Sequence, residues 1–134
     1  ADEEVAALRS YLRNGGILAM TPEGTRSKTG CLLEARPGTI FLAWKAGVPI
    51  VPVALVGTED AVVMDRLKHF RRLEIKAVAG QPFHLAQDLG GQERDAALQQ
   101  ATEEVMCRVA ALLPEDRRGF YADRPRLKEL LQAS

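Results

Sequence analysis

Residues 37–56 read PGTIFLAWKAGVPIVPVALV, and this stretch decides the expected fold. Pro37 suits the first position of a helix, where a missing N–H is no loss, and Gly47 suits the left-handed residue that ends one. Residues 49–56 are rich in valine and isoleucine, which predicts a buried strand. Because proline cannot donate to a strand ladder, Pro52 indicates an edge, a bulge, or a backbone that faces something other than a strand.

Apolar periodicity outside this stretch predicts further helices and strands. They are a helix over residues 3–14 that stops at two glycines, a buried strand over 17–20, a half-buried strand over 72–79, and a long helix over 92–113. Residues 114–134 form a charged tail in which 127–131 can make one short helix. Strands that alternate with helices favour an α/β fold, a layered sheet flanked by helices.

Composition limits the classes of function. The chain has 134 residues, is 46% hydrophobic and carries no formal net charge, whereas nucleic-acid binders show a basic excess. Its longest apolar run, residues 48–56, is interrupted by two prolines and is shorter than the ~20 residues of a spanning helix. Lys68, Arg71 and Arg72 are interpreted as a solvated patch, with contact to anionic lipid headgroups as the alternative.

Cysteine and histidine are sparse. Cys31 and Cys107 lie far apart, and His69 and His84 do not complete a zinc pattern with them. We therefore expect two reduced thiols and no metal site. The helical pattern begins at once and without a methionine, from which we expect further residues upstream.

Residues 21–27, TPEGTRS, carry the chemistry of a phosphate site. They follow an expected strand, and open α/β sheets bind ligands at the carboxyl ends of strands. Gly24 lets the backbone approach an anion, Thr25 and Ser27 offer hydroxyls, and the planar guanidinium of Arg26 matches phosphate oxygens.

Glu23 cannot contact the phosphate directly, because a carboxylate and a phosphate repel each other. We expect it to hold Arg26 or to accept a hydrogen bond from a substrate hydroxyl. The alternative for residues 21–27 is a surface turn with a solvated Glu–Arg pair, since loops are commonly polar.

This loop is part of a longer stretch that resembles a known protein family. Residues 22–27, PEGTRS, resemble the third motif of the 1-acylglycerol-3-phosphate acyltransferases, also called lysophosphatidic acid acyltransferases. Arg36 lies where that family has a basic residue shortly before a glycine that opens a helix. Residues 46–55, AGVPIVPVAL, resemble the fourth motif with its lead-in, and VGTE at 56–59 continues the pattern. The resemblance covers residues 3–82.

The resemblance implies phospholipid biosynthesis. Such enzymes transfer an acyl group from acyl-CoA or acyl carrier protein to the free hydroxyl of lysophosphatidate, without a metal or other cofactor. It further implies that residues 1–113 are the C-terminal portion of an acyltransferase domain, working at the cytoplasmic face of a membrane. Phosphate binding would fall to Glu23, Gly24, Thr25, Arg26, Ser27 and Arg36, and shaping of the substrate site to Pro49, Ile50 and Pro52.

The family's catalytic His-x4-Asp motif is absent from this chain. His84 and Asp88 have three residues between them, and His69 is followed by Glu74, with both histidines after the phosphate motif. We expect no catalytic residue in this chain and negligible transferase activity from it alone, because a positioned general base contributes ~10²–10⁴-fold. A non-catalytic headgroup-binding module or an inactive relative is the alternative. Self-association through an unpaired sheet edge is also expected.

Overall fold

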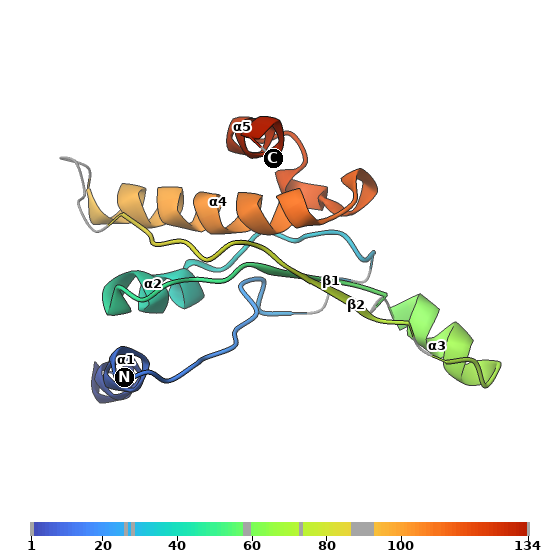
Figure 1. Cartoon of the computed structure of the whole chain (residues 1–134), viewed down its shortest axis with the longest axis horizontal. Coiled ribbons are helices and arrows are strands. Elements are labelled where there is room, and N and C mark those ends of the chain that lie inside the picture. Colours follow the sequence, from blue (N-terminus) through green and yellow to red (C-terminus); the bar gives the residue numbers. More distant parts are fainter. Residues whose placement is uncertain are drawn as a thin grey trace.

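The computed structural model describes residues 2–25, 27, 29–57, 60–72, 74–86 and 93–133. They form a mixed α/β arrangement in which helices stack on a small sheet (Figure 1). The long helix α4 (Arg94–Leu112) lies along the sheet, α5 (Pro125–Ala133) covers α4, and α1 (Asp2–Arg13) lies at the opposite side of the molecule (Figure 1).

The three helices with the clearest sequence signals are confirmed. α1 ends at Arg13, two residues before Gly15, whose φ is 94°. α2 (Pro37–Ala46) begins with a proline and is capped by Gly47, whose φ is 66°. α4 differs from its predicted bounds by two residues at its start and one at its end. The Arg13 guanidinium Nε donates to the Ala46 carbonyl oxygen at 3.1 Å, which connects the ends of α1 and α2.

The described residues contain one sheet, formed by two antiparallel strands, β1 (Val53–Val56) and β2 (Lys76–Ala79). Both strands are shorter than predicted. Val53 pairs with Ala79, whereas the isolated bridge pairs Ile50 with Phe83. Two residues therefore separate these pairs on one strand and three on the other, which is a bulge. The extra residue lies among residues 80–82, and Pro52 lies opposite this bulge, where its carbonyl accepts the Gly80 N–H at 2.8 Å. The prediction that Pro52 marks an irregularity of the ladder is thereby confirmed.

The strand predicted over residues 17–20 is wrong. The segment is not assigned as a strand, and no backbone hydrogen bond joins it to the rest of the described chain. It is also not buried, since Ile17 is 88% exposed. A strand requires a neighbour to satisfy its N–H and C=O groups, and the described residues place none beside this segment. An apolar run thus predicts burial only when a partner exists.

The prediction that β1 is a buried strand needs a similar correction. Ala54 faces α4 and is buried, whereas Val53 and Leu55 point to the other face of the sheet and are about half-exposed. Alternation along the strand puts these residues on opposite faces, and only one face is covered. The predicted layered sheet is therefore not confirmed, and the coarser description of a mixed α/β chain with a small sheet holds.

Two apolar clusters meet along α4. The first surrounds Met106, Cys107 and Ala110, and the second joins α2 to the bridge segment through Trp44, Phe83 and Val105 among others. The Trp44 indole Nε1 donates to the Ala86 carbonyl at 3.0 Å. Trp44 on α2 and Val105, Met106 and Ala110 on α4 are thus core residues. Met106, Leu127 and Cys107 are the largest side chains that are fully buried.

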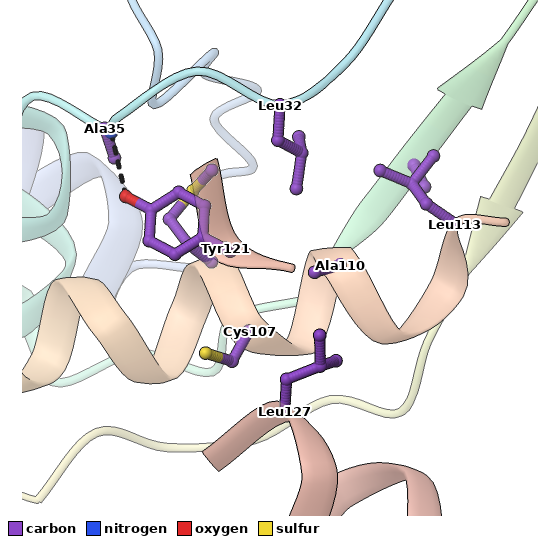
Figure 2. Close-up of a cluster of buried hydrophobic side chains, with 9 residues drawn as sticks. Leu32, Ala35, Cys107, Ala110, Leu113, Tyr121 and Leu127 are labelled. Atoms are coloured by element: carbon purple, nitrogen blue, oxygen red, sulfur yellow. Dashed lines mark hydrogen bonds between the residues drawn. The ribbon is translucent and has the colours of Figure 1, made fainter. Parts of the chain in front are cut away.

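The segment after Pro114 completes the first cluster. Two short 3-10 turns, η1 (Glu115–Arg117) and η2 (Gly119–Tyr121), lead into α5. Figure 2 shows Tyr121 and Leu127 entering the same cluster as Cys107 and Ala110. The predicted short helix of the tail exists and is longer than expected, because it packs on α4 through an apolar side and is not only a charged extension.

The helix α3 (Asp60–Lys68) has no counterpart in the sequence prediction. It follows β1 and projects beyond the end of the two strands (Figure 1). The apolar residues that signal it, Val62, Val63 and Leu67, lie in a stretch interpreted only for its basic charges. None of the described helices is both long and apolar enough to cross a bilayer.

The Glu104 carboxylate holds α5 against α4 and gives the fold a dependence on pH. Its oxygens accept from Arg126 Nε at 2.7 Å and Nη2 at 3.0 Å, and from Arg108 Nε at 2.8 Å. The hydrogen bonds from Arg126, with a smaller effect of Arg108, lower the Glu104 pKa below its ordinary value of 4.5, although burial opposes this. The pair stabilises the folded chain above the ordinary pKa, and this contribution is lost as the pH falls through the lowered one.

We expect Glu104→Gln to lower the free energy of unfolding by about 1 kcal/mol at neutral pH, a value reduced for solvent screening of a partly exposed pair. Urea unfolding at neutral pH and well below pH 4.5 measures it. The two proteins should converge in acid, because the wild-type carboxylate is then protonated. Glu4→Gln on α1 is the control and should match the wild type at both pH values. A Glu104→Gln deficit that persists unchanged in acid would contradict this account.

Candidate functional site

The loop of residues 21–25 is a tight turn after the apolar segment 17–20. The Gly24 N–H donates to the Thr21 carbonyl oxygen at 3.1 Å, and Gly24 has φ of 71°. This left-handed conformation penalises a residue with a Cβ, so glycine is required here by the backbone. The approach of an anion to the backbone at Gly24 stays a prediction.

Two hydrogen bonds hold the turn against residues 32–36, the segment that leads into α2. The Glu23 carboxylate oxygen Oε2 accepts the Leu33 N–H at 2.8 Å, and the Pro22 carbonyl accepts the Arg36 N–H at 2.8 Å. Glu23 is half-buried. Its carboxylate is therefore used within the described chain to brace the loop, a role that the sequence prediction did not include.

Arg36 lies against the turn. A Cβ built on Gly24 would come within 2.9 Å of Arg36 Cδ and 3.1 Å of Nε, so the side chain passes directly over the glycine. The guanidinium forms no hydrogen bond or ion pair with any part of the chain that the structure describes, and the residue is exposed. Two residues that are twelve positions apart and were predicted to share a phosphate site are thus brought together.

The remaining loop positions form few contacts with the described chain. Thr25 is exposed, and Ser27 is half-buried with its Oγ 3.3 Å from the Thr29 Oγ1. Arg26, the centre of the sequence prediction, lies outside the described residues. Its position relative to Gly24 and Arg36 stays a prediction.

Pro49, Ile50 and Pro52 do not lie on one surface. Pro49 is exposed, Ile50 is half-buried and pairs with Phe83, and Pro52 is buried beneath α4. Pro52 borders a shallow hollow of about 130 Å³ that α4 and α5 also line. Of the described residues, the lining of this hollow includes none of the predicted phosphate-loop positions. The role of the three residues in shaping a substrate site stays a prediction.

The histidines and cysteines are not arranged as a catalytic or metal site. His69 is exposed directly after α3, with Nδ1 2.9 Å from the Asp65 carbonyl, and His84 is exposed. Both cysteines are free thiols, and burial, followed by the carboxylates of Glu103 and Glu104, raises the Cys107 pKa to about 11. Among the described residues no group of acidic, histidine and cysteine side chains could hold a metal ion.

The C-terminal part of the chain positions the segment beside the loop. The Tyr121 hydroxyl accepts the Ala35 N–H at 2.9 Å (Figure 2). The Leu32 N–H donates to the Arg117 carbonyl, and the Leu32 carbonyl accepts from Phe120 N–H, both at 3.1 Å. Burial raises the Tyr121 pKa, so the hydroxyl stays neutral. Sequence reasoning missed this support, because nothing in a charged tail indicates contacts with residues 32–35.

The arrangement suits an anion. It presents the exposed guanidinium of Arg36, a left-handed glycine without a side chain, and neighbouring hydroxyls. Glu23 joins the loop to the segment of residues 32–36, and Tyr121 holds that segment through the Ala35 N–H. An arginine guanidinium forms strong paired hydrogen bonds with phosphate or carboxylate oxygens. A loop that is already held in place loses less conformational entropy when a ligand binds to it.

Comparison with known proteins finds a family that this region resembles. The sequence model of the family described as "Acyltransferase" matches residues 1–56, which include the loop and Arg36. Residues 1–56 are thus similar to the acyltransferase family, in agreement with the resemblance of the motifs. No solved structure matches the chain significantly.

The chain is similar to several curated proteins named 1-acyl-sn-glycerol-3-phosphate acyltransferase. The protein of Cocos nucifera is 46% identical over 59 residues, which are 44% of this chain and 18% of that protein. The protein of Salmonella typhimurium is 37% identical over 70 residues, or 52% of this chain and 29% of the relative. That of Limnanthes douglasii is 51% identical over 55 residues, or 41% and 20%. The chain therefore spans less than a third of the length of each.

Proposed function

We propose that this chain supplies the acceptor-phosphate side of a glycerolipid acyltransferase active site. The reaction is transfer of an acyl group from acyl-CoA or acyl carrier protein to the hydroxyl of lysophosphatidate, 1-acylglycerol-3-phosphate. The general base would come from outside this chain. The acyl donor serves as co-substrate, and no metal or other cofactor takes part in the proposal.

The observation that carries the proposal is the position of Arg36 over Gly24. The resemblance to acyltransferases extends over both residues. The exposed guanidinium of Arg36 lies beside the left-handed Gly24 and forms no hydrogen bond or ion pair with the described residues, so it is available to a ligand. We assign Arg36 and Arg26 to the acceptor phosphate, with hydroxyls from Thr25 and Ser27 beside them. Glu23 supports the loop from behind by accepting the Leu33 N–H.

Several finer features belong to the same proposal. Pro49, Ile50 and Pro52 would shape the site through the course of the backbone before β1. A layered sheet would require further strands beside β1 and β2. Lysophosphatidate is a membrane lipid, so the complete protein would act at a membrane surface, which we place at the cytoplasmic face.

Replacing either arginine should weaken use of the phosphorylated acceptor. In the complete gene product, Arg26→Ala or Arg36→Ala is expected to lower kcat/KM for lysophosphatidate at least about tenfold, since a hydrogen bond to a charged group contributes about 1.5–3 kcal/mol. Arg26→Lys should recover only part, because an ammonium lacks the planar fork. The assay uses a labelled acyl thioester, with 1-monoacylglycerol as the acceptor that lacks phosphate.

Lys128→Ala, an exposed basic residue on α5, is the matched control and should leave both acceptors unaffected. The arginine variants should lose discrimination in favour of the phosphorylated acceptor. Equal kinetics of Arg26→Ala and wild type with lysophosphatidate would remove the phosphate assignment. A complete product that binds lysophosphatidate but never transfers an acyl group would instead indicate the non-catalytic headgroup-binding module.

A further inference from the structure

An aromatic residue just after α3 has an unfavourable backbone conformation. Phe70 has φ of 54° and is the one non-glycine residue with positive φ in the described chain. Its N–H donates to the Leu67 carbonyl and that of Arg71 to the Arg66 carbonyl, the pattern of a helix end closed by a left-handed residue. Glycine is the usual residue at this position, because a Cβ is penalised there.

The Phe70 side chain gains nothing inside the fold to offset this conformation. It is 99% exposed. Met64 and Leu67, three residues apart on one side of α3, are 65% and 56% exposed. We call Met64, Leu67 and Phe70 the apolar tip. An exposed group of large apolar side chains on a projecting element is typical of a surface that docks on something else.

Positive charge surrounds the apolar tip. From Asp60 to Arg72, α3 and the turn after it contain four basic residues against two acids, Asp60 and Asp65, although the whole chain has no net charge. Lys68, Arg71 and Arg72 are exposed. Arg66 is half-buried and donates Nη1 to the Arg72 carbonyl at 3.2 Å, which holds the segment after the turn next to the helix.

We propose that α3 and the turn after it dock on an anionic lipid surface, with the apolar tip inserted among the lipids and Lys68, Arg71 and Arg72 contacting their headgroups. Apolar side chains flanked by basic ones are the composition of interfacial membrane anchors. α3 projects from the body beyond the end of β1 and β2, away from α4 and α5 (Figure 1).

The charges favour lipid over a second copy of the chain. Two copies joined through the apolar tip would bring two basic rims together, and like charges in contact oppose association. An anionic bilayer instead supplies the opposite charge around the same apolar residues. The docking proposal rests only on α3 and the turn after it. It also deepens the proposed function, because docking would hold the phosphate loop close to an acceptor lipid in the membrane.

Phe70→Gly is a sharp test, because it removes the largest apolar side chain of the apolar tip and places a glycine at a backbone position with positive φ. The 134-residue chain is sedimented with vesicles of phosphatidylcholine, with and without phosphatidylglycerol. Wild type should bind the anionic vesicles, less strongly at high salt. Phe70→Gly should bind at least about tenfold more weakly, given the free energy of burying a phenylalanine side chain, while its melting temperature stays equal or rises. Ile17→Gly removes an exposed apolar residue elsewhere and should bind like wild type.

Charge is tested with matched triple variants. Lys68→Gln/Arg71→Gln/Arg72→Gln should reduce binding by on the order of 100-fold, at about fivefold per basic residue. Arg9→Gln/Lys45→Gln/Lys128→Gln carries the same change in net charge away from α3 and should retain binding. Binding of Phe70→Gly equal to wild type would overturn the proposal. So would a wild-type dimer that Phe70→Gly converts to monomer in sedimentation velocity, because the apolar tip would then join two copies.

A separate variant distinguishes the two proposals. Arg26→Gln/Arg36→Gln should leave vesicle binding unchanged, because the phosphate loop is not part of the docking surface. If this variant loses vesicle binding and the α3 variants keep it, the headgroups are held by the phosphate loop and the α3 proposal fails. If the α3 variants alone lose binding, docking is supported whether or not the complete protein proves to be an acyltransferase.

Discussion

Leu127→Ala is expected to lower the free energy of unfolding by about 2–5 kcal/mol, the range for truncating a buried leucine. Leu127 is 1% exposed and belongs to the cluster that joins α5 to α4 (Figure 2). Its loss leaves a cavity on top of the lost apolar burial. Since small domains are stable by only about 5–15 kcal/mol, this one change removes a large share. Urea unfolding followed by the fluorescence of Trp44, the single tryptophan, measures it.

Leu67→Ala is the control for the same chemical change. Leu67 is 56% exposed, so its truncation should shift stability by less than about 0.5 kcal/mol. If Leu127→Ala unfolded at the same urea concentration as the wild type, α5 would not pack on α4 as described. The segment after Pro114 would then be an independent tail.

Gly119→Ala is expected to cost about 2–5 kcal/mol of stability, from a left-handed residue that gains a Cβ and from crowding of the backbone beside it. Gly119 has φ of 51°, and an added Cβ would collide with the Leu32 backbone oxygen. The collision pushes on residues 32–36, the segment that carries the partner of Glu23 and also Arg36. We therefore expect weaker binding of inorganic phosphate, measured by NMR titration under conditions where the variant is still folded.

Gly38→Ala is the matched control. A Cβ on Gly38 meets nothing within 4 Å, and the residue lies in α2, where alanine is favoured over glycine. It should keep or slightly raise stability and should bind phosphate like wild type. Gly119→Ala with the stability of wild type would mean that residues 117–120 do not pack against Leu32.

The sequence grouped Gly24 with Arg36, but it did not predict the contacts that support the loop. Gly24 and Arg36 were both assigned to an anion site, and the structure brings them together. The Glu23–Leu33 bond and the Tyr121 hydroxyl on Ala35 were not foreseen. A hydrogen bond between positions 86 apart depends on how the chain folds back, and local residue patterns contain no signal for it.

The sequence by itself determined the elements whose signals are local. Pro37 and Gly47 delimit α2, glycines end α1, and the loop residues carry their own chemistry, because helix capping and side-chain type depend on a few neighbouring residues. Tertiary structure alone decided which apolar runs are covered. Residues 17–20 and the outer face of β1 are as apolar as the core yet exposed, since burial requires a partner surface that the described chain does not place there. The same holds for the apolar tip at the end of α3, whose three side chains are largely exposed in the part of the chain that the structure describes.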